Sequence, residues 1–206
     1  MNDKIPDNQF SRAADPAFME HPELSARLDA LLHSAKPYLI AAIDGNSGAG
    51  KSWLADRIGA AYECNVIHAD DFFLRPEQRT PERLSEPGGN VDYERLESEV
   101  YSQIAKGTPF KYRKFDCSVM SFGDTVTVTP RRLTVIEGSY SLHPKLSAYC
   151  DLKIFLKISA EDQAERILER NGPVMAQRFE QEWIPKENLY FNTFHIEENC
   201  DLVFTA

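Results

Sequence analysis

Cysteine is scarce in this sequence, and no stretch of uninterrupted apolar residues is long enough to cross a membrane. Four cysteines are spread over 206 residues without a CxxC pair, which excludes zinc knuckles and dithiol redox motifs. The longest clear apolar run covers residues 38–43, and the first ten residues lack the apolar segment of a secretory signal. We therefore expect reduced, structural cysteines and a cytoplasmic protein without membrane partners.

Positive charge is also in short supply. Lysine and arginine number 23 against 32 aspartates and glutamates, which gives a formal net charge of -9. Nucleic acids and anionic membranes bind basic surfaces, so neither is expected as a partner. Residues 105–132 depart from this pattern, with six basic and two acidic side chains. Positive charge is thus gathered in one segment, where a small phosphorylated ligand would need it.

The remaining composition is that of a globular enzyme. Hydrophobic residues make up 42% of the chain and charged residues 27%, far from the composition of disordered proteins. Internal repeats and low-complexity segments are absent from the sequence, so we expect a single domain over residues 1–206. Short apolar runs predict an α/β fold with a central, mostly parallel five-stranded sheet flanked by helices. The predicted strands cover residues 38–43, 65–68, 133–136, 152–158 and 202–204.

Two segments are added to this pattern. Residues 1–37 form an N-terminal helical extension, in which leucines recur at helical spacing between residues 24 and 32. Residues 109–129 contain two β-rich stretches joined by a turn-like SVMSFG. They predict an inserted β-hairpin with Gly123 in its turn.

One motif combines the right spacing with the right context. Directly after residues 38–43 comes GNSGAGKS, which satisfies G-x-x-x-x-G-K-[ST] and opens a helical pattern. In such loops glycines let backbone N–H groups surround phosphate oxygens at a helix N-terminus, lysine reaches the β and γ phosphates, and the hydroxyl binds Mg²⁺. The predicted cofactors are therefore ATP and Mg²⁺, with Lys51 also catalytic and Ser52 also a metal ligand. The predicted binding residues are Gly45, Asn46, Ser47, Gly48, Ala49, Gly50, Lys51 and Ser52.

Acidic residues follow two of the predicted strands. Asp70 and Asp71 come directly after residues 65–68, at the edge where ligands bind in open α/β sheets. A kinase that phosphorylates an alcohol needs a carboxylate beside the acceptor hydroxyl, and we predict Asp70 as this base with Asp71 in reserve. Glu137 ends a later strand and is predicted to hold magnesium. The alternatives are that the aspartates cap the next turn and that Glu137 pairs with a neighbouring base.

Together these motifs resemble the uridine kinase branch of the P-loop kinases, with pantothenate kinase and phosphoribulokinase as more distant relatives. The resemblance extends from about residue 38 to residue 204 and rests on GNSGAGKS, DDFF, the hairpin KYRKFD and DTVTV, the strand VIEG and the helix ERILERNG. It implies the P-loop NTPase fold. It also implies that Asp70 is the catalytic base and a magnesium ligand, and that Glu137 helps to hold the metal.

The resemblance also assigns a lid. Residues 160–180 match the family's lid region, whose arginines close on the triphosphate, and this implies catalytic roles for Arg166 and Arg170. Their i,i+4 spacing puts both guanidinium groups on one helical face, where they are able to converge on one anion. A capping box at Ser159 predicts the start of this helix and Gly172 predicts its end. The alternative for the two arginines is surface pairing with acidic neighbours.

The acceptor side departs from the family pattern. Uridine kinases carry a Phe-Asp-His-Pro-type segment whose acid binds ribose hydroxyls, whereas residues 86–93 read EPGGNVDY, and Asp92 is predicted to take that role. The hairpin offers Tyr112 and Arg113 without the family's histidine. These two residues join Asp71 among the predicted substrate contacts. The departures leave a different alcohol open as the acceptor.

We therefore predict an ATP-dependent kinase that transfers the γ-phosphoryl group to a hydroxyl of a nucleoside, uridine- or cytidine-like, or of a related metabolite. Two alternatives stay open: a P-loop NTP hydrolase with water as the nucleophile, and a non-catalytic or regulatory ATP-binding module. The sequence has no guanine-reading Asn-Lys-x-Asp motif, and a hairpin with an arginine-bearing helix suits an acceptor pocket and lid. The predicted partner is a small hydroxyl compound, and the sequence leaves a homo-oligomer open.

Overall fold

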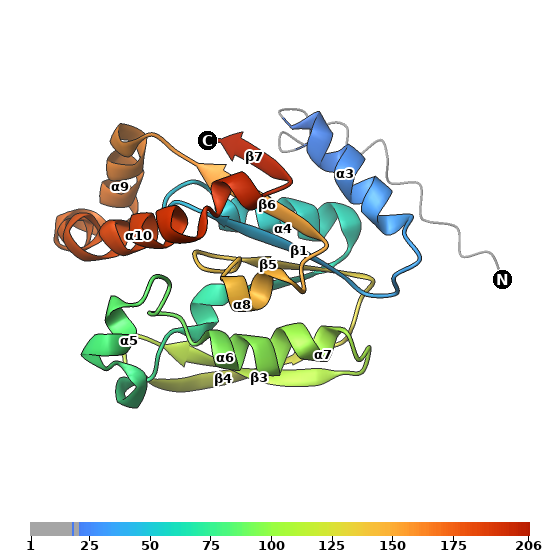
Figure 1. Ribbon diagram of the computed structural model, residues 1–206, viewed down its shortest axis with the longest axis horizontal. Coiled ribbons are helices and arrows are strands. Elements are labelled where there is room, and N and C mark those ends of the chain that lie inside the picture. Colours follow the sequence, from blue (N-terminus) through green and yellow to red (C-terminus); the bar gives the residue numbers. More distant parts are fainter. Residues whose placement is uncertain (1–17, 19–20) are drawn as a thin grey trace.

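A parallel five-stranded sheet forms the centre of the computed structural model, which describes Phe18 and residues 21–206 (Figure 1). The strands lie in the order β2-β5-β1-β6-β7, and all neighbouring pairs are parallel. The predicted α/β class and the five predicted strands are confirmed. Residues 1–17 and 19–20 of the predicted extension lie outside the described residues. The strands are β1 (Leu39–Gly45), β2 (Asn65–His68), β5 (Leu133–Glu137), β6 (Leu152–Lys157) and β7 (Leu202–Thr205).

Strand β1 is buried on both faces of the sheet. All seven of its residues are buried, and successive side chains point to opposite faces. Leu39, Ala41 and Ile43 join one apolar core, whereas Ile40 and Ala42 join the other. A continuous apolar run, rather than an alternating one, is what a strand between two cores requires.

The first core lies between the sheet and two helices, α3 (Pro22–Leu32) and α4 (Lys51–Tyr62) (Figure 1). Leu24 and Leu28 of α3 are completely buried, which confirms the helix predicted in the extension. Ile58 brings the apolar face of α4 into the same core. Full burial of such a side chain stabilises the fold by about 1.5–3 kcal/mol.

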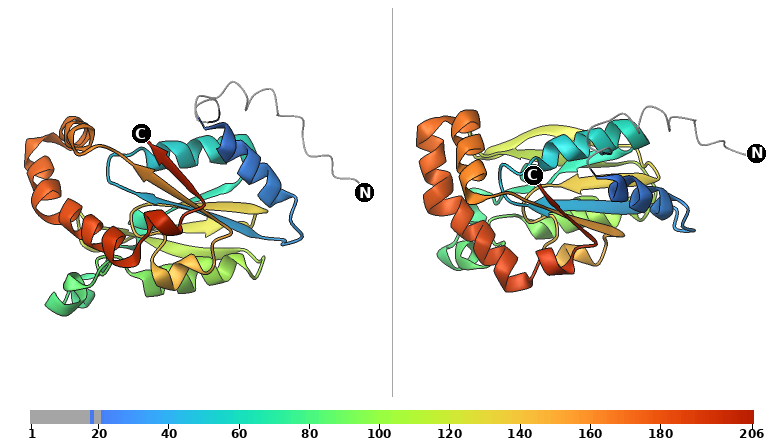
Figure 2. Two further views of the ribbon diagram at one scale, coloured as in Figure 1. Left: turned by 45° about the horizontal axis from the view of Figure 1, so that its top comes forward. Right: turned by 90° about the horizontal axis from the view of Figure 1, so that it is seen from above.

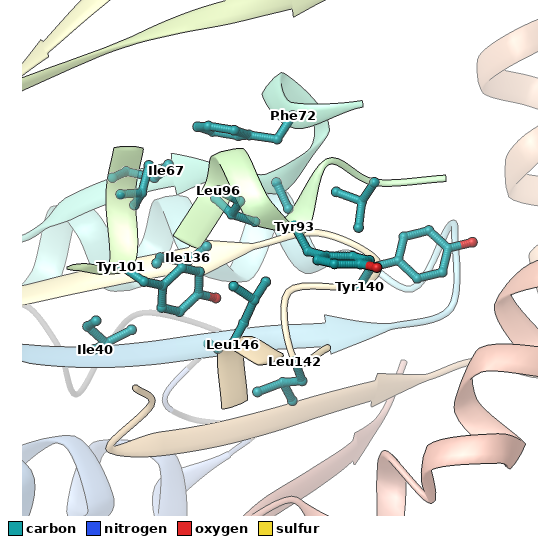
Figure 3. Close-up of a cluster of buried hydrophobic side chains, with 14 of the residues drawn as sticks. Ile40, Ile67, Phe72, Tyr93, Leu96, Tyr101, Ile136, Tyr140, Leu142 and Leu146 are labelled. Atoms are coloured by element: carbon teal, nitrogen blue, oxygen red, sulfur yellow. The ribbon is translucent and has the colours of Figure 1, made fainter. Parts of the chain in front are cut away.

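The second core lies on the opposite face of the sheet and is drawn in Figure 3. Tyr101 and Leu146 pack there with Ile40 of β1. The Tyr101 hydroxyl donates a hydrogen bond to the backbone oxygen of Ser141 at 2.7 Å, which satisfies a polar group inside an apolar cluster. The helical elements on this face include α6 (Tyr93–Leu96), the π-helical η3 (Glu97–Tyr101), α7 (Ser102–Ile104) and α8 (Pro144–Ser147).

An antiparallel hairpin stands apart from the central sheet. It consists of β3 (Phe110–Asp116) and β4 (Ser121–Val128), as the β-rich stretches predicted. The prediction that Gly123 lies in the turn is wrong, because β4 begins before this residue. Phe115 pairs with Phe122 across the hairpin with ring centroids 5.8 Å apart, and this edge-to-face contact extends the ladder toward the turn.

The chain after β6 forms a helical arm that curves around one end of the molecule (Figure 2). The first helix begins at Ser159, whose hydroxyl oxygen accepts a hydrogen bond from the Asp162 N–H, so the predicted N-cap is confirmed. Gly172 has φ 75° and ψ 170°, so the first helical stretch stops at its predicted end, although helical residues resume at Pro173 and α9 continues to Arg178. This lid arm consists of α9 (Ala160–Arg178), the π-helical η4 (Phe179–Trp183) and α10 (Ile184–Phe194).

Short helical turns complete the described structure. Three of them follow β2 and carry the chain over the end of the sheet toward the hairpin (Figure 1). Within the described ranges, none of the helices combines the length and the apolar character needed to span a bilayer. The short elements are η1 (Ala69–Phe72), η2 (Pro76–Gln78), α5 (Pro81–Ser85) and η5 (Glu197–Asn199).

Candidate functional site

A cavity of about 1440 Å³ opens at the carboxyl ends of the parallel strands, where ligands bind in open α/β sheets. The loop between β1 and α4 and the lid arm form one part of its wall. Another part comes from η1, the segment that follows it and the hairpin turn at residues 117–120. The predicted site residues that line this cavity are Ser47, Gly48, Ala49, Gly50, Lys51, Ser52, Asp70, Glu137, Arg166 and Arg170.

Glycines set the conformation of the predicted phosphate-binding loop. Gly45 has φ 136°, and a Cβ there would lie 2.0 Å from the backbone oxygen of Leu156. Gly50 caps α4 in the left-handed conformation, with φ 89°. The loop thereby presents backbone N–H groups and the N-terminus of α4 to the cavity. This geometry favours an anion, as the sequence motif predicts.

Lys51 lies along the loop instead of extending into solvent. Its Nζ donates hydrogen bonds to the backbone oxygens of Gly45 at 2.8 Å and Asn46 at 3.0 Å. It also donates to Ser139 Oγ at 3.3 Å. The ammonium group is therefore held in place before a phosphate arrives, which reduces the entropic cost of binding.

Glu137 links the end of β5 to the loop. Its Oε1 accepts a hydrogen bond from Ser52 Oγ at 3.0 Å and lies 2.5 Å from His68 Nδ1. The hydrogen bond with Glu137 raises the pKa of His68 against the opposing effect of burial. The alternative predicted for Glu137, pairing with a neighbouring base, is thus also present.

The donor set around Glu137 fits magnesium. Ser52, Glu137 and Asp70 offer hydroxyl and carboxylate oxygens at one edge of the cavity. Across the described residues, no three or more histidine, cysteine or acidic side chains gather into a complete metal cage. Mg²⁺ needs no such cage, because it usually takes one or two carboxylates and completes its shell with phosphates and water.

Asp70 occupies the turn after β2 and lines the cavity. Gly138 permits this position, because a Cβ on Gly138 would lie 2.9 Å from the Cβ of Ala69 and 3.4 Å from Asp70 Oδ1. The Asp70 side chain is open to the cavity, yet the surrounding protein displaces enough water that desolvation raises its pKa. Lys51 opposes this increase. A raised pKa strengthens the ionised carboxylate as a proton acceptor.

Glu187 is a residue of the site that sequence reasoning missed. It lies on α10 and is 3% exposed. Its carboxylate accepts hydrogen bonds from the Ser47 N–H at 3.1 Å, the Ser47 hydroxyl at 2.5 Å and the Ser139 hydroxyl at 2.8 Å. The lid arm therefore touches the phosphate-binding loop through a negative charge. The available signal was an acid in a helix that also carries Tyr190, Phe191 and Phe194.

Asp44 is a second residue that the sequence did not single out. It is completely buried at the end of β1. Its carboxylate accepts hydrogen bonds from the N–H groups of Gly45 at 2.8 Å, Tyr140 at 3.1 Å and Leu142 at 3.0 Å, and from the Tyr190 hydroxyl at 2.9 Å. Burial raises the pKa of Asp44 to about 6 although these hydrogen bonds oppose the shift. Asp44 thus fixes the turn after β5 and α10 to the base of the loop.

Both predicted lid arginines line the cavity. Arg166 Nη1 donates to the backbone oxygen of Gly48 at 3.3 Å, and Arg170 Nε donates to Asn171 Oδ1 at 2.8 Å. Arg178 lines the same cavity from the later part of α9. Among the described residues, no ion pair joins Arg166 or Arg170 to an acidic neighbour on α9. Both guanidinium groups therefore remain available to a ligand in the cavity.

Two of the predicted acceptor contacts come together behind the cavity wall. The Tyr112 hydroxyl donates a hydrogen bond to Asp71 Oδ2 at 3.2 Å, and Lys114 Nζ lies 3.4 Å from the same oxygen. These contacts tie the turn after β2 to the hairpin. Neither Asp71 nor Tyr112 is among the residues that line the cavity.

The other two predicted acceptor contacts lie elsewhere. Asp92 is 1% exposed and caps α6 by accepting the Arg95 N–H at 3.0 Å. The Arg113 guanidinium lies over the ring of Phe122, 3.8 Å from its centroid. Neither Asp92 nor Arg113 lines the cavity. Their roles in acceptor binding stay predictions, and the structure gives each a local structural contact.

Comparison with known proteins identifies the fold. Neither a protein-family model nor a curated protein sequence matches the chain. Among solved structures, the chain is similar to a candidate fructose transport system kinase from Silicibacter sp., with TM-score 0.71 and 22% identity over 88% of this chain and 97% of that chain. It is similar to a possible uridine kinase from Bacillus stearothermophilus, with TM-score 0.64 and 20% identity over 88% of this chain and 99% of that chain. It is also similar to phosphoribulokinase from Rhodobacter spheroides, with TM-score 0.56 and 14% identity over 83% of this chain and 71% of that chain. The chain therefore has the fold of P-loop kinases.

Proposed function

We propose that the protein is an ATP-dependent kinase that transfers the γ-phosphoryl group to a hydroxyl of a small metabolite, either a nucleoside or a related compound. One observation carries this proposal: a single cavity is lined by Lys51 of the loop, by the hydrogen-bonded Ser52 and Glu137, and by Asp70. The three solved structures compared above are named as kinases, which supports this class of reaction.

The proposal gives each part of the chain a place around one cavity. Residues 1–206 form one kinase domain that acts in the cytoplasm, with residues 1–37 as its extension. The hairpin at residues 109–129 borders the acceptor, and residues 160–180 form the lid. The presence of both the lid arm and the hairpin turn in the cavity wall supports this division.

The residues of the site support an in-line transfer. Backbone N–H groups of the loop and Lys51 hold the triphosphate, and Asp70 accepts the proton of the acceptor hydroxyl. The hydroxyl oxygen then forms a bond to the γ-phosphorus while the bond from that phosphorus to the bridging oxygen breaks, and ADP leaves. When bound at Ser52, Glu137 and Asp70, Mg²⁺ supplies positive charge that offsets the charge of the phosphates.

The lid arm contributes charges of both signs. Arg166 and Arg170 line the cavity, and in this proposal they bind the triphosphate and exclude water when the arm closes. Glu187 already accepts the Ser47 N–H, a donor of the phosphate-binding loop. We therefore expect Glu187 to release Ser47 when the triphosphate binds.

A transfer assay tests the proposal. The protein is incubated with Mg-ATP and a pooled metabolite extract, and mass spectrometry detects any compound that becomes heavier by one phosphoryl group. Asp70→Asn is expected to lower the transfer rate about 10³-fold because it removes the base, with ATP binding by calorimetry little changed. Asp56→Asn is the matched control, because Asp56 is exposed on α4 outside the cavity.

Other results would favour the alternatives. ADP formation at the full rate without any acceptor, and unaffected by Asp70→Asn, would indicate an NTP hydrolase. Tight ATP binding without phosphoryl transfer to any compound in the extract would indicate a regulatory ATP-binding module.

A further inference from the structure

The cavity is larger than the part lined by Asp70 and by the residues proposed to bind the phosphates. Asp70 borders a part of it that approaches α5, which Figure 1 places at the same end of the molecule as the lid arm. We call this part the acceptor end. Its lining consists of Phe73, Arg79, Asn90, Tyr140 and, from the hairpin turn, Cys117, Ser118 and Met120.

Arg79 is the charged residue that distinguishes the acceptor end. It lies between η2 and α5, is half-buried and lines the cavity. In the part of the chain that the structure describes, its guanidinium has neither a hydrogen-bond acceptor nor an ion-pair partner. A guanidinium carries five N–H donors and a permanent charge, so partial burial without a partner is unfavourable.

The other basic side chains of the cavity differ from Arg79 in this respect. Each of them contacts an oxygen atom of the protein, either on the phosphate-binding loop or within the lid arm. Among the lysines and arginines of the described lining, Arg79 is thus the one whose side chain contacts no oxygen atom of the protein, which leaves all of its N–H donors available to a ligand. The five other residues are Lys51, Arg166, Arg170, Arg178 and Lys186.

Arg79 and Asp70 act on the same region of the cavity. Burial raises the pKa of the Cys117 thiol, and the positive charge of Arg79 opposes this increase while the negative charge of Asp70 adds to it. Both charges therefore lie within electrostatic reach of one atom at the hairpin turn. A small acceptor in this space is able to meet both residues.

We propose that the acceptor carries an anionic group, a carboxylate or a phosphate, which binds to Arg79 while a hydroxyl of the same molecule meets Asp70. This inference rests on the proposed kinase function and narrows its substrate class to hydroxy acids and phosphorylated polyols or sugars. Arginine binds both anions through two parallel hydrogen bonds, which also orient the ligand. A neutral acceptor would leave the charge of Arg79 unpaired in the closed site.

Matched acceptors that differ in charge provide the test. Transfer from Mg-ATP is measured with glycerol, D-glycerate and glycerol 3-phosphate, with ribose and ribose 5-phosphate, and with uridine. Binding of the same compounds to the Mg-ADP complex is measured by calorimetry, which needs no turnover. We expect an anionic compound to bind and react while its neutral counterpart does not. The glycerate and phosphate arms then identify which anion the site takes.

Variants of Arg79 assign the effect to this residue. Arg79→Gln is expected to raise the KM for the anionic acceptor about tenfold to a hundredfold, the usual value of hydrogen bonds to a charged group, with the KM for ATP unchanged. Arg79→Lys keeps the charge without the planar fork and is expected to recover part of the loss. Arg27→Gln, on the exposed surface of α3, is the matched control.

Distinct results would overturn this inference and the proposed function. Equal phosphorylation of uridine or another neutral acceptor by wild type and Arg79→Gln would reject the anionic acceptor and leave the kinase function standing. A change in the KM for ATP instead of the acceptor would assign Arg79 to the nucleotide and also reject it, as would the absence of binding and transfer for every anionic compound. Full ATP hydrolysis without an acceptor would reject the kinase function itself.

Discussion

The phosphate end and the acceptor end of the cavity are built in opposite ways. Residues 45–52 are consecutive, and glycines within them set the loop conformation locally. The acceptor end instead joins Phe73, Arg79 and Asn90 with Tyr140 and the hairpin turn, which are far apart in the sequence. A site made from consecutive residues leaves a motif in the sequence, whereas one assembled by the topology of the chain does not.

The greatest loss of activity is expected from replacing Lys51, which lies at the phosphate end of the cavity. Lys51→Met removes the ammonium group that contacts Gly45 and Asn46 and that we propose to hold the triphosphate. We expect phosphoryl transfer to fall about 10³-fold, the cost of losing one donor to developing charge, with weaker nucleotide binding. Steady-state kinetics and calorimetry measure both. Lys111→Met, exposed on β3, is the control, and unchanged ATP binding in Lys51→Met would contradict the assignment.

The protein is expected to lose stability in acid because of the buried His143. His143 is buried near Gly88, and its ring stacks on that of Tyr93 with the ring centroids 4.2 Å apart. Burial lowers the pKa of His143 to about 4, and the positive charges of Lys145 and Arg83 act in the same direction. The unfolded chain binds a proton near pH 6.5, so the free energy of unfolding decreases as the pH falls from 6.5 to 4. The loss is on the order of 3 kcal/mol for this shift.

Urea unfolding of wild type and His143→Gln between pH 7 and pH 4 measures this effect. The difference between the two proteins isolates His143 from other titrating groups, including Asp44, whose raised pKa acts in the opposite direction. A difference that does not change with pH would show that His143 titrates normally.

Gly138 lies beside Asp70, between the two ends of the cavity, and adding one methyl group at this position is expected to lower activity. Gly138→Ala places a Cβ 2.9 Å from the Cβ of Ala69, in a backbone conformation with φ 135°. We expect it to displace Asp70 and to lower kcat at least about tenfold, with a stability loss of about 1–3 kcal/mol. Gly123→Ala is the control, because its nearest neighbouring atom lies at 4.0 Å. Normal kcat in a stable Gly138→Ala variant would contradict the packing argument.

The smallest effect is expected from replacing Glu187, which connects the lid arm to the phosphate-binding loop. Glu187→Gln keeps the shape of the side chain and removes the negative charge beside Ser47. We expect ATP to bind about three- to tenfold more tightly, because a repulsive charge near the triphosphate is lost. Glu180→Gln, exposed on η4, is the control. Weaker ATP binding in Glu187→Gln would mean that the carboxylate organises the loop for the nucleotide.

The strands and helices could be predicted from the sequence because local or periodic residue patterns determine them. Apolar runs located the five strands, and a positive φ at Gly172 breaks α9 where the sequence predicted its end. Gly123 was misplaced because the pairing of Phe115 with Phe122 carries the ladder past the expected turn start. Local patterns do not include such cross-strand contacts.

The candidate site likewise contains residues that local patterns predicted and residues that only contacts between distant segments bring in. Residues 47–52 of the loop line one cavity together with Asp70 and Glu137, as their positions after strands suggested, whereas Gly45 and Asn46 are not part of its lining. The substrate contact of Asp92 stays a prediction, and its position directly before α6 makes it the N-cap of that helix. Glu187 and Arg79 entered the site through the folding of distant segments, and their surroundings in the sequence carry no motif.

The role of Asp70 as the base is tested by measuring acceptor-dependent ADP formation and ATP affinity in the same preparation of Asp70→Asn. We expect transfer to the acceptor to fall about 10³-fold while the Kd for ATP changes less than about threefold. Wild-type transfer by a folded Asp70→Asn variant would contradict the assignment of Asp70 as the base at the boundary between the two ends.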